Sequence, residues 1–259
     1  MKYRTVWLSD IHLGSKGCQA DKLLAFLKQV ECEYLFLVGD IIDIWAMKRQ
    51  FYWPETHNTI IQKFLRKARH GTKVIYIPGN HDEMFRQYII DHPISFGDIE
   101  IHQEYLHTLA NGKTVLCIHG DYYDVVMKYH KWLAFVGDIG YSILLWLNRH
   151  FNYLRKLLRM RYWSISQYIK YKVKSAVSFI GHFEQNVISE CKDRGVDCIL
   201  CGHIHHAEMK QYGDILYLNT GDTVESCTAI VETYNNELVL LGFGKDEIEI
   251  IAGHKFNDH

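Results

Sequence analysis

The chain has 259 residues, of which 48% are hydrophobic, 14% aromatic and 23% charged, and its formal net charge is −1. These values are typical of a globular protein with a large core, and they exclude an intrinsically disordered chain. The chain has only 3 prolines and 18 glycines, which excludes a collagen-like or low-complexity protein. Histidine is unusually frequent, with 16 residues, and it is a common metal ligand.

Along the chain, short apolar runs alternate with amphipathic segments, which predicts an α/β fold. We expect strands at Thr5–Ser9, Tyr34–Val38, Lys73–Ile77, Thr114–Ile118, Asp197–Cys201, Ile215–Asn219, Thr228–Glu232 and Leu238–Phe243. We expect helices at Ala20–Val30, Thr56–Arg69, Glu83–Tyr88 and Phe183–Arg194.

The cysteines indicate a reducing environment. There are seven, an odd number, and no secretory signal precedes the first strand, so we expect free thiols and a cytoplasmic location. Cys198 and Cys201 form a C-x-x-C pattern, but positions i and i+3 of a strand face opposite sides of the sheet. We therefore interpret this pair as small buried residues and not as a metal or redox site.

Each of the first five predicted strands is followed by a polar cluster. The clusters are Asp10-Ile-His12, Gly39-Asp40-Ile-Ile-Asp43, Gly79-Asn80-His81-Asp82, His119-Gly120-Asp121 and Gly202-His203-Ile-His205. Open α/β sheets bind ligands at the carboxyl ends of their strands, so we expect the five clusters to form one site. A single Asp or His after a strand is usually a turn residue, and the prediction therefore depends on all five clusters together.

The residue types in these clusters point to metal chemistry. Carboxylate oxygens, an amide oxygen and at least four imidazoles suit divalent Mn, Fe, Zn or Co better than Ca²⁺, which prefers oxygen ligands alone. Seven donors are too many for one tetrahedral ion, but they suit two ions that share a carboxylate. Such a pair of ions can clamp the attacking and leaving oxygens of a phosphoryl transfer.

The ordered series D-x-H, G-D-x-x-D, G-N-H-D, H-G-D and G-H-x-H resembles the calcineurin-like metallophosphoesterase superfamily across nearly the whole chain. The resemblance implies a four-layer αββα sandwich of two mixed β-sheets, with residues 1–259 in one domain. It also implies an enzyme that hydrolyses a phosphoester or pyrophosphate bond with two divalent metal ions. Mn²⁺ is the expected metal, with Fe, Zn or Co as alternatives.

The resemblance also implies a set of metal ligands. One ion is expected at Asp10, His12 and His205, the other at Asn80, His119 and His203, and the carboxylate of Asp40 is expected to bridge them.

Other residues are expected to act on the substrate. His81 would contact the substrate phosphate, either stabilising its charge or protonating the leaving group, and Asp82 would orient His81. Arg86, His206 and Trp132 are further candidates for substrate binding. The histidines outside the clusters are expected at the surface or as caps: His57, His70, His102, His107, His130, His150, His182, His254 and His259.

Segment 125–180 interrupts the alternation of strands and helices. It is helical in pattern and aromatic, and its ten basic residues against one acidic residue give it a net charge of +9. The remaining 203 residues therefore carry −10. Its apolar stretch Leu133–Leu147 contains Asp138 and is shorter than the roughly 20 residues of a bilayer span. We expect a helical insertion that acts as a lid or faces a membrane, with a hairpin packed on the core as the alternative.

The motif continuations S-D-I-H-L-G-S-K-G and V-G-D-I-I-D-I-W are similar to those of UDP-2,3-diacylglucosamine diphosphatases. This resemblance implies cleavage of a lipid-linked nucleotide sugar into UMP and an acylated sugar 1-phosphate, as in lipid A biosynthesis, by a cytoplasmic enzyme peripheral to the inner membrane. Those enzymes often carry Arg where this chain has His81, and Arg-Pro where it has His206-Ala207. The alternatives are a phosphodiesterase or phosphatase of soluble nucleotides, a nuclease that binds nucleic acid through the basic insertion, and a non-enzymatic scaffold.

Overall fold

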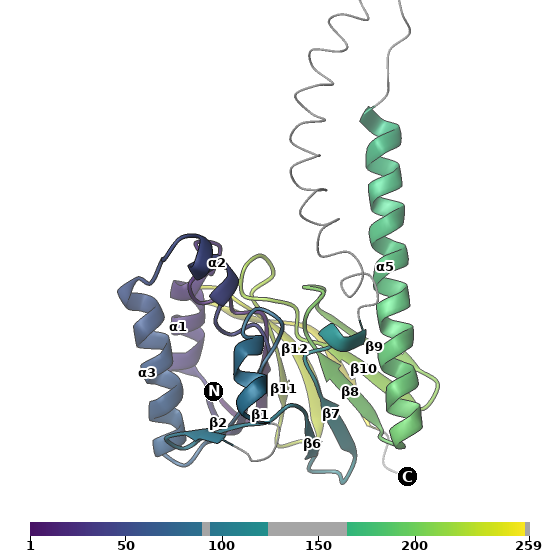
Figure 1. Ribbon diagram of the computed structural model, residues 1–259. Coiled ribbons are helices and arrows are strands. Elements are labelled where there is room, and N and C mark those ends of the chain that lie inside the picture. The colour runs from purple at the N-terminus through teal and green to yellow at the C-terminus, as the bar shows by residue number, and fades with distance from the viewer. Residues whose placement is uncertain (90–93, 124–164, 257–259) are drawn as a thin grey trace, which may run out of the picture. The chain divides into compact units, whose positions relative to one another are not determined.

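The computed structural model describes residues 1–89, 94–123 and 165–256. It divides into two compact units, one formed by Met1–Asp121 with Val187–His259 and the other by Tyr122–Asn186. The first unit contains two β-sheets and carries all five polar clusters (Figure 1). The predicted insertion, 125–180, stays a prediction, because 124–164 lie outside the described residues.

The larger sheet has eight strands in the order β13-β12-β11-β1-β2-β3-β5-β4. Strands β1, β2, β3 and β5 run parallel to one another, and the remaining pairs are antiparallel. Their bounds are β1 Lys2–Leu8, β2 Glu31–Val38, β3 Lys73–Ile77, β4 Ile94–Phe96, β5 Ile99–Ile101, β11 Thr228–Glu232, β12 Glu237–Phe243 and β13 Ile248–Lys255.

The smaller sheet has five strands in the order β6-β7-β8-β10-β9. Strands β7, β8 and β10 are parallel, and the outer strands β6 and β9 are antiparallel to their neighbours. Their bounds are β6 Tyr105–Thr108, β7 Thr114–Cys117, β8 Cys198–Cys201, β9 Glu208–Tyr212 and β10 Ile215–Asn219. Both sheets are therefore mixed, as the resemblance implies.

Two apolar clusters hold the layers together. Along β1, Val6 and Leu8 pack with residues of the helices α1 (Ala20–Gln29) and α3 (Glu55–Arg69), which Figure 1 shows beside one another on the larger sheet. Trp7, between them in the chain, points to the other face and packs with residues of the smaller sheet. Both faces of the central strands are thus buried, which explains why they are apolar at nearly every position.

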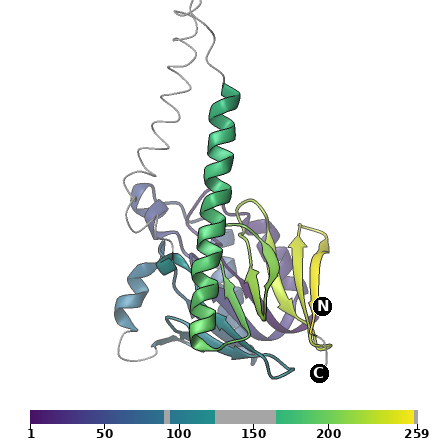
Figure 2. The same cartoon turned by 90° about the vertical axis from the view of Figure 1, so that its right-hand side faces the viewer.

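The other helices are α2 (Ile44–Arg49), α5 (Ile165–Arg194) and the 3₁₀ turns η1 (Glu83–Tyr88) and η2 (Asp121–Tyr123). The end of α5, Val187–Arg194, belongs to the first unit, where Figures 1 and 2 show it along the smaller sheet and Val187 and Cys191 are buried. Within the described residues, no helix combines the length and the apolar character that crossing a membrane requires.

The predicted strands and helices are all present, with end shifts of up to a few residues, and two of them differ in kind or extent. Segment Glu83–Tyr88 forms a 3₁₀ helix, and the predicted helix at Phe183–Arg194 is the end of the longer α5. The strands β4, β5, β6, β9 and β13 were not expected. Four of these, β4, β6, β9 and β13, lie at sheet edges, where half-exposed strands lack a continuous apolar run.

Two histidines expected at the surface or as caps are instead buried among polar partners. The ring of His57 accepts a hydrogen bond from the backbone N–H of Gly14 at 3.0 Å, and His107 lies 3.1 Å from the hydroxyl of Thr5. Each imidazole is buried because its ring nitrogen has a partner that replaces water. All seven cysteines are free thiols, as expected.

Candidate metal centre

The five polar clusters come together because they follow strands whose carboxyl ends lie at one edge of the two sheets. The loops after β1, β2 and β3 belong to the larger sheet, and those after β7 and β8 to the smaller one. These loops carry the eight predicted metal and phosphate contacts Asp10, His12, Asp40, Asn80, His81, His119, His203 and His205. A site between two sheets thus collects ligands from both.

The backbone of these loops is unusual. Among the described residues, seven non-glycine residues have positive φ, and five of them are predicted ligands: Asp10, His12, Asp40, His203 and His205, with φ between 48° and 68°. Left-handed backbone is unfavourable for residues with a Cβ, and it concentrates at functional sites where the fold enforces it. The conformation turns each side chain out of the strand direction and toward the centre of the site.

Glycines before the ligands leave room for side chains from neighbouring loops. A Cβ at Gly79 would collide with the carboxylate of Asp40, and a Cβ at Gly202 would collide with that of Asp10. The G-N and G-H pairs of the motifs therefore have a steric reason, since each ligand loop passes directly over a carboxylate of another loop.

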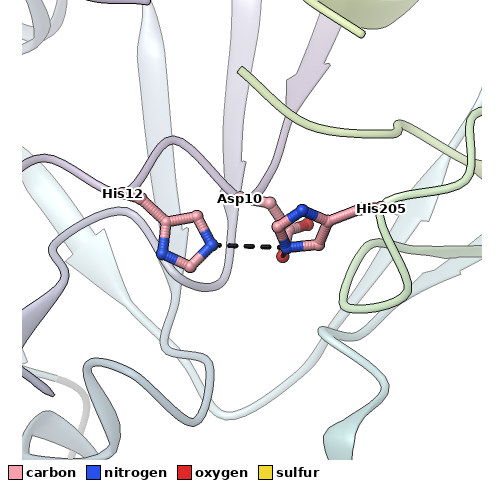
Figure 3. A group of neighbouring side chains, drawn as sticks. All are labelled: Asp10, His12 and His205. Carbon is pink, nitrogen blue, oxygen red and sulfur yellow. Dashed lines mark hydrogen bonds and ion pairs between the residues drawn. The ribbon is translucent and has the colours of Figure 1, made fainter. Parts of the chain in front are cut away.

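Asp10, His12 and His205 form the first group, which we call the Asp10 cluster (Figure 3). His12 Nε2 lies 3.3 Å from His205 Nε2, and His205 Nε2 lies 3.3 Å from Asp10 Oδ1. Asp10 Oδ1 is buried, and within the described part of the chain no donor reaches it with hydrogen-bond geometry. The other carboxylate oxygen accepts the backbone N–H of His203 at 3.0 Å and the hydroxyl of Ser9.

Asn80, His119 and His203 form the second group, which we call the Asn80 cluster. His119 Nε2 lies 3.3 Å from Asn80 Oδ1, and the rings of His119 and His203 are 5.2 Å apart. Asp40 lies between the two clusters, with Oδ2 3.5 Å from His119 Nε2 and 4.0 Å from His12 Nε2. The position of Asp40 fits the bridging role that the resemblance implies.

The charges of this site favour a cation. Burial lowers the pKa of His119, but the negative charge of Asp40, their hydrogen bond and the charges of Asp10 and Asp121 outweigh it and raise the pKa to about 10. Burial raises the pKa of Asp40, but the nearby histidines, His119 above all, hold it well below its usual range. Buried carboxylates of this kind require a positive partner.

The residues present fit a divalent metal. Among the described residues, histidine nitrogens and carboxylate oxygens that lie within 4.8 Å of one another form the groups Asp10, His12, His205; Asp10, Asp40, His119; and His12, Asp43, His81. The buried Asp10 oxygen without a donor and the paired imidazole nitrogens are the arrangement expected when the same atoms coordinate one cation. The site is therefore a divalent metal-binding site.

His81 lies beside this centre and is held by Asp43, a residue to which the sequence alone gave no role. Asp43 Oδ1 lies 2.9 Å from His81 Nδ1, and Oδ2 lies 3.2 Å from His12 Nδ1. Asp43 also caps α2 by accepting the N–H of Ala46 at 2.7 Å. The only signal in the sequence was the second aspartate of G-D-x-x-D, at the start of a helix.

The expected role of Asp82 needs correction. Its fully buried carboxylate accepts the hydroxyl of Tyr76 at 2.5 Å and the backbone N–H groups of Gly79, Ile41 and Ile42 at 2.5, 2.8 and 3.2 Å. These bonds tie the Asp40 loop to the Asn80 loop. Because the side chain of Asp82 points into the core, it holds the backbone of these loops. The ring of His81 is contacted by Asp43.

The three remaining candidates are placed differently. Arg86 bonds Asp121 and the carbonyl oxygen of Pro78, with 12% of its side chain exposed. The side chain of His206 is 51% exposed and lies 4.0 Å from Glu208. Trp132 lies outside the described residues.

Several solved structures have similar folds. The phosphoesterase YfcE from E. coli has 14% sequence identity and a TM-score of 0.49, with 98% of this chain and 99% of that chain covered. Vps29 from Entamoeba histolytica, complexed with Zn²⁺, has 11% identity, a TM-score of 0.47 and coverage of 98% and 99%. A dimetal phosphatase from Danio rerio has 12% identity, a TM-score of 0.43 and coverage of 96% and 98%.

No curated protein matches the chain. The sequence profile described as calcineurin-like phosphoesterase matches residues 3–207, which include all of the predicted ligands. The chain therefore belongs to the calcineurin-like phosphoesterase family and is a metal-dependent phosphoester hydrolase.

Proposed function

We propose that the protein hydrolyses the pyrophosphate of a lipid-linked nucleotide sugar of the UDP-2,3-diacylglucosamine type, releasing UMP and an acylated sugar 1-phosphate. The main support for hydrolysis is the position of His81. Asp43 holds its ring beside a cluster of buried carboxylates and imidazoles. The substrate is inferred from the surroundings of this centre and from the motif continuations.

Two divalent ions would be held by the Asp10 cluster and the Asn80 cluster, with Asp40 between them. When bound, such ions lower the pKa of water and offset the negative charge of the phosphoryl oxygens. Asp82 supports the bridging Asp40 and the Asn80 cluster indirectly, because its hydrogen bonds connect the loops of Asp40 and Asn80.

His81 is placed to handle the proton of the leaving group. Its Nδ1 is bound to Asp43, so Nε2 is the nitrogen free to act, and it lies 3.9 Å from Asp40 Oδ2. Burial lowers the pKa of His81, but the hydrogen bond to Asp43 and the charges of Asp40 and Asp43 raise it overall. A protonated imidazole can give its proton to the leaving oxygen as water attacks phosphorus and the P–O bond breaks.

Aromatic and basic residues around α2 support an amphipathic anionic substrate. The ring of Trp45 lies 4.3 Å from that of His81 with an interplanar angle of 33°. At the end of α2, Lys48 and Arg49 are exposed, and Phe51 just beyond is 75% exposed. Aromatic rings can contact a base or an acyl chain, and the basic residues can contact phosphate. The insertion 125–180 has the same aromatic and basic composition, which supports peripheral contact with a membrane surface.

The test is hydrolysis of the lipid itself. Protein loaded with Mn²⁺ is incubated with UDP-2,3-diacylglucosamine in detergent micelles, and UMP is measured by chromatography. We expect UMP release with the wild type and with Arg69→Gln, which changes an exposed arginine of α3, and at least about a hundredfold less with His81→Asn. The absence of UMP would overturn the lipid assignment.

A second candidate is hydrolysis of soluble phosphodiesters or nucleotides. It is favoured by His81 and His206, which stand where the lipid-linked diphosphatases often carry arginine. Rapid hydrolysis of bis-p-nitrophenyl phosphate, without stimulation by detergent or lipid and without UMP from the lipid, would support it. Cleavage of single- or double-stranded DNA in the same assay would point instead to a nuclease.

A further inference from the structure

Arg86 joins two loops of the metal centre through one buried side chain. Its Nη1 and Nη2 donate to the two oxygens of Asp121 at 2.8 and 2.7 Å. Its Nε and Nη2 also donate to the carbonyl oxygen of Pro78 at 3.1 and 2.6 Å. Only 12% of either charged side chain is exposed. A guanidinium is a rigid planar fork, so these four bonds fix direction as well as distance.

The two acceptors stand at matched positions in the sequence. Pro78 is two residues before Asn80, in the loop after β3 of the larger sheet. Asp121 is two residues after His119, in the loop after β7 of the smaller sheet. Between them, Asn80 Oδ1 and His119 Nε2 are 3.3 Å apart. The guanidinium thus spans the junction of the two sheets next to the two ligands that meet there.

Arg86 is itself held in place from the other side. It lies on η1, which begins directly after Asp82, and Asp82 is fixed by its bonds to Tyr76 and to the backbone of Gly79. The N–H of Phe85 also bonds the carbonyl oxygen of Asp82 at 3.2 Å. The 3₁₀ turn η1 is thus fixed where it begins, and this fixes the position from which the side chain of Arg86 extends.

This arrangement argues against Arg86 as a direct ligand of the substrate phosphate. A bidentate contact to phosphate uses the same fork that already bonds both oxygens of Asp121. Releasing Asp121 would leave a carboxylate that is largely buried without its cation, which is costly. The bonds of Arg86 to the two loops are thus more favourable in free energy than a bidentate contact with phosphate.

We propose that Arg86 is a positioning residue, which sets the separation of Asn80 and His119 through Pro78 and Asp121 and so determines the affinity of the Asn80 cluster for its metal ion. The inference deepens the proposed function, since it rests on the assignment of one ion to each cluster. It predicts a selective effect, because the four hydrogen bonds of Arg86 go to the loops that carry Asn80 and His119.

The test is a calorimetric titration of chelator-treated protein with Mn²⁺, without any substrate. For Arg86→Gln we expect one of two binding events to weaken by about 10- to 100-fold and the other to change by less than about threefold, as for residues that support metal ligands. Arg86→Lys keeps the charge but not the fork, and its loss should be intermediate. Arg69→Gln, an exposed arginine of α3, is the matched control and should bind like the wild type.

Further variants identify the event. In His205→Ala, which cripples the Asp10 cluster, the remaining event should be the one that Arg86→Gln weakens. Asp121→Asn removes the partner charge, and we expect the same selective loss. The double variant Arg86→Gln/Asp121→Asn should be no weaker than either single variant, because both remove one interaction. If thermal unfolding shows that Arg86→Gln does not fold, the same titration of Arg86→Lys and Asp121→Asn replaces it.

Three results would overturn the proposal. The first is an equal loss of both binding events, which indicates a general structural role. The second is unchanged Mn²⁺ affinity with a reduced affinity for inorganic phosphate in the Mn²⁺-loaded protein, which indicates substrate binding. The third is uptake of one ion only by the wild type. The titration contains no substrate, so failure to hydrolyse any substrate would sink the proposed function and leave this inference standing.

Discussion

Strand β1 leads through one buried cluster of histidine and carboxylate groups and ends at another, and the two clusters balance their charge in different ways. One lies at the middle of the strand, where Arg4 and Thr5 meet His107 and Glu232, and we call it the Glu232 cluster. Beyond its end lies the metal centre around Asp10 and Asp40. Both contain imidazole beside carboxylate, so residue type alone does not separate them.

In the Glu232 cluster every charge has a partner from the chain. Glu232 Oε1 accepts Arg4 Nη1 and the N–H of Ala110, both at 2.7 Å, and Oε2 accepts the hydroxyl of Thr5 at 2.6 Å. The hydroxyl proton is used in that bond, so the ring of His107 donates to Thr5 from Nε2. Thr5 and Glu232 are direct partners in the β1–β11 ladder. Regular strands position Arg4, Thr5, His107 and Glu232, and Ala110 lies in the turn between β6 and β7.

The metal centre differs both in its hydrogen bonding and in its backbone. Asp10 keeps a buried oxygen without a hydrogen-bond donor among the described residues, and its imidazole neighbours face each other across 3.3 Å. Five of the predicted ligands lie in loops with left-handed backbone, which costs free energy and persists where the surrounding structure enforces it. In this protein the metal centre has a buried oxygen without a hydrogen-bond donor and strained backbone. In the Glu232 cluster every charged group is paired.

The largest effect is expected at the carboxylate that both metal clusters share. Asp40→Asn should reduce hydrolysis by about a thousandfold and abolish at least one Mn²⁺ binding event, because a neutral amide replaces the bridging charge. Hydrolysis is measured with bis-p-nitrophenyl phosphate, and binding by calorimetry.

Retained Mn²⁺ binding together with full hydrolysis by Asp40→Asn would contradict the bridging role of Asp40, and it would remove the contrast with the Glu232 cluster.

Glu232→Gln should have the opposite profile. It leaves Arg4 without its buried partner, so we expect the free energy of unfolding to fall by about 3 kcal/mol while Mn²⁺ affinity stays within about twofold of the wild type. The measurement is chemical denaturation of the metal-free protein. Loss of metal binding by a correctly folded variant would contradict the separation of the two clusters.

This difference should also depend on pH. Burial raises the pKa of Glu232, but hydrogen bonds from His107, Thr5 and Ala110 and the charge of Arg4 lower it overall. A carboxyl with a lowered folded-state pKa stabilises the fold above its unfolded pKa of about 4.3, and this stabilisation is lost as pH falls through the folded value. The gap between the wild type and Glu232→Gln should therefore be full near neutral pH and shrink below about pH 4.

A smaller effect on rate is expected at Asp43. Asp43→Asn removes the charge that keeps the pKa of His81 raised, so the alkaline limb of the pH profile of kcat/KM should move to lower pH. We expect kcat to fall by about 10- to 100-fold. An unchanged profile would show that His81 does not supply the proton. His102→Gln, at a half-buried histidine bonded to Glu100, serves as the control.

The smallest effect is expected at the C-x-x-C pair. Cys198 is fully buried in β8, and burial raises the pKa of its thiol to about 12. Cys198→Ala should leave metal content unchanged and cost about 1 kcal/mol of stability. The native thiol should also react slowly with alkylating agents. Loss of metal from Cys198→Ala would show that the C-x-x-C pair takes part in metal binding.

Much of the fold was predictable because the central strands are buried on both faces. Their apolar runs, such as Lys73–Ile77 and Ile215–Asn219, have the bounds expected from the sequence. The ligand loops were predictable for a related reason, since each polar cluster directly follows such a run. Edge strands like β9, with the sequence EMKQY, have a mixed exposure that no short pattern distinguishes from a loop.

Within the site, the sequence by itself predicted a set of metal-binding residues and their order, and it determined the family. Only the tertiary structure decided which carboxylate serves which partner: Asp43 contacts His81, Asp82 bonds the backbone, and Arg86 bonds Asp121. It also decided that His107 is buried, since its partner Thr5 lies 102 positions away in the chain. Local patterns encode which face of a strand is apolar and where a strand ends. Pairing across two sheets depends on contacts between residues far apart in sequence, and no local pattern contains them.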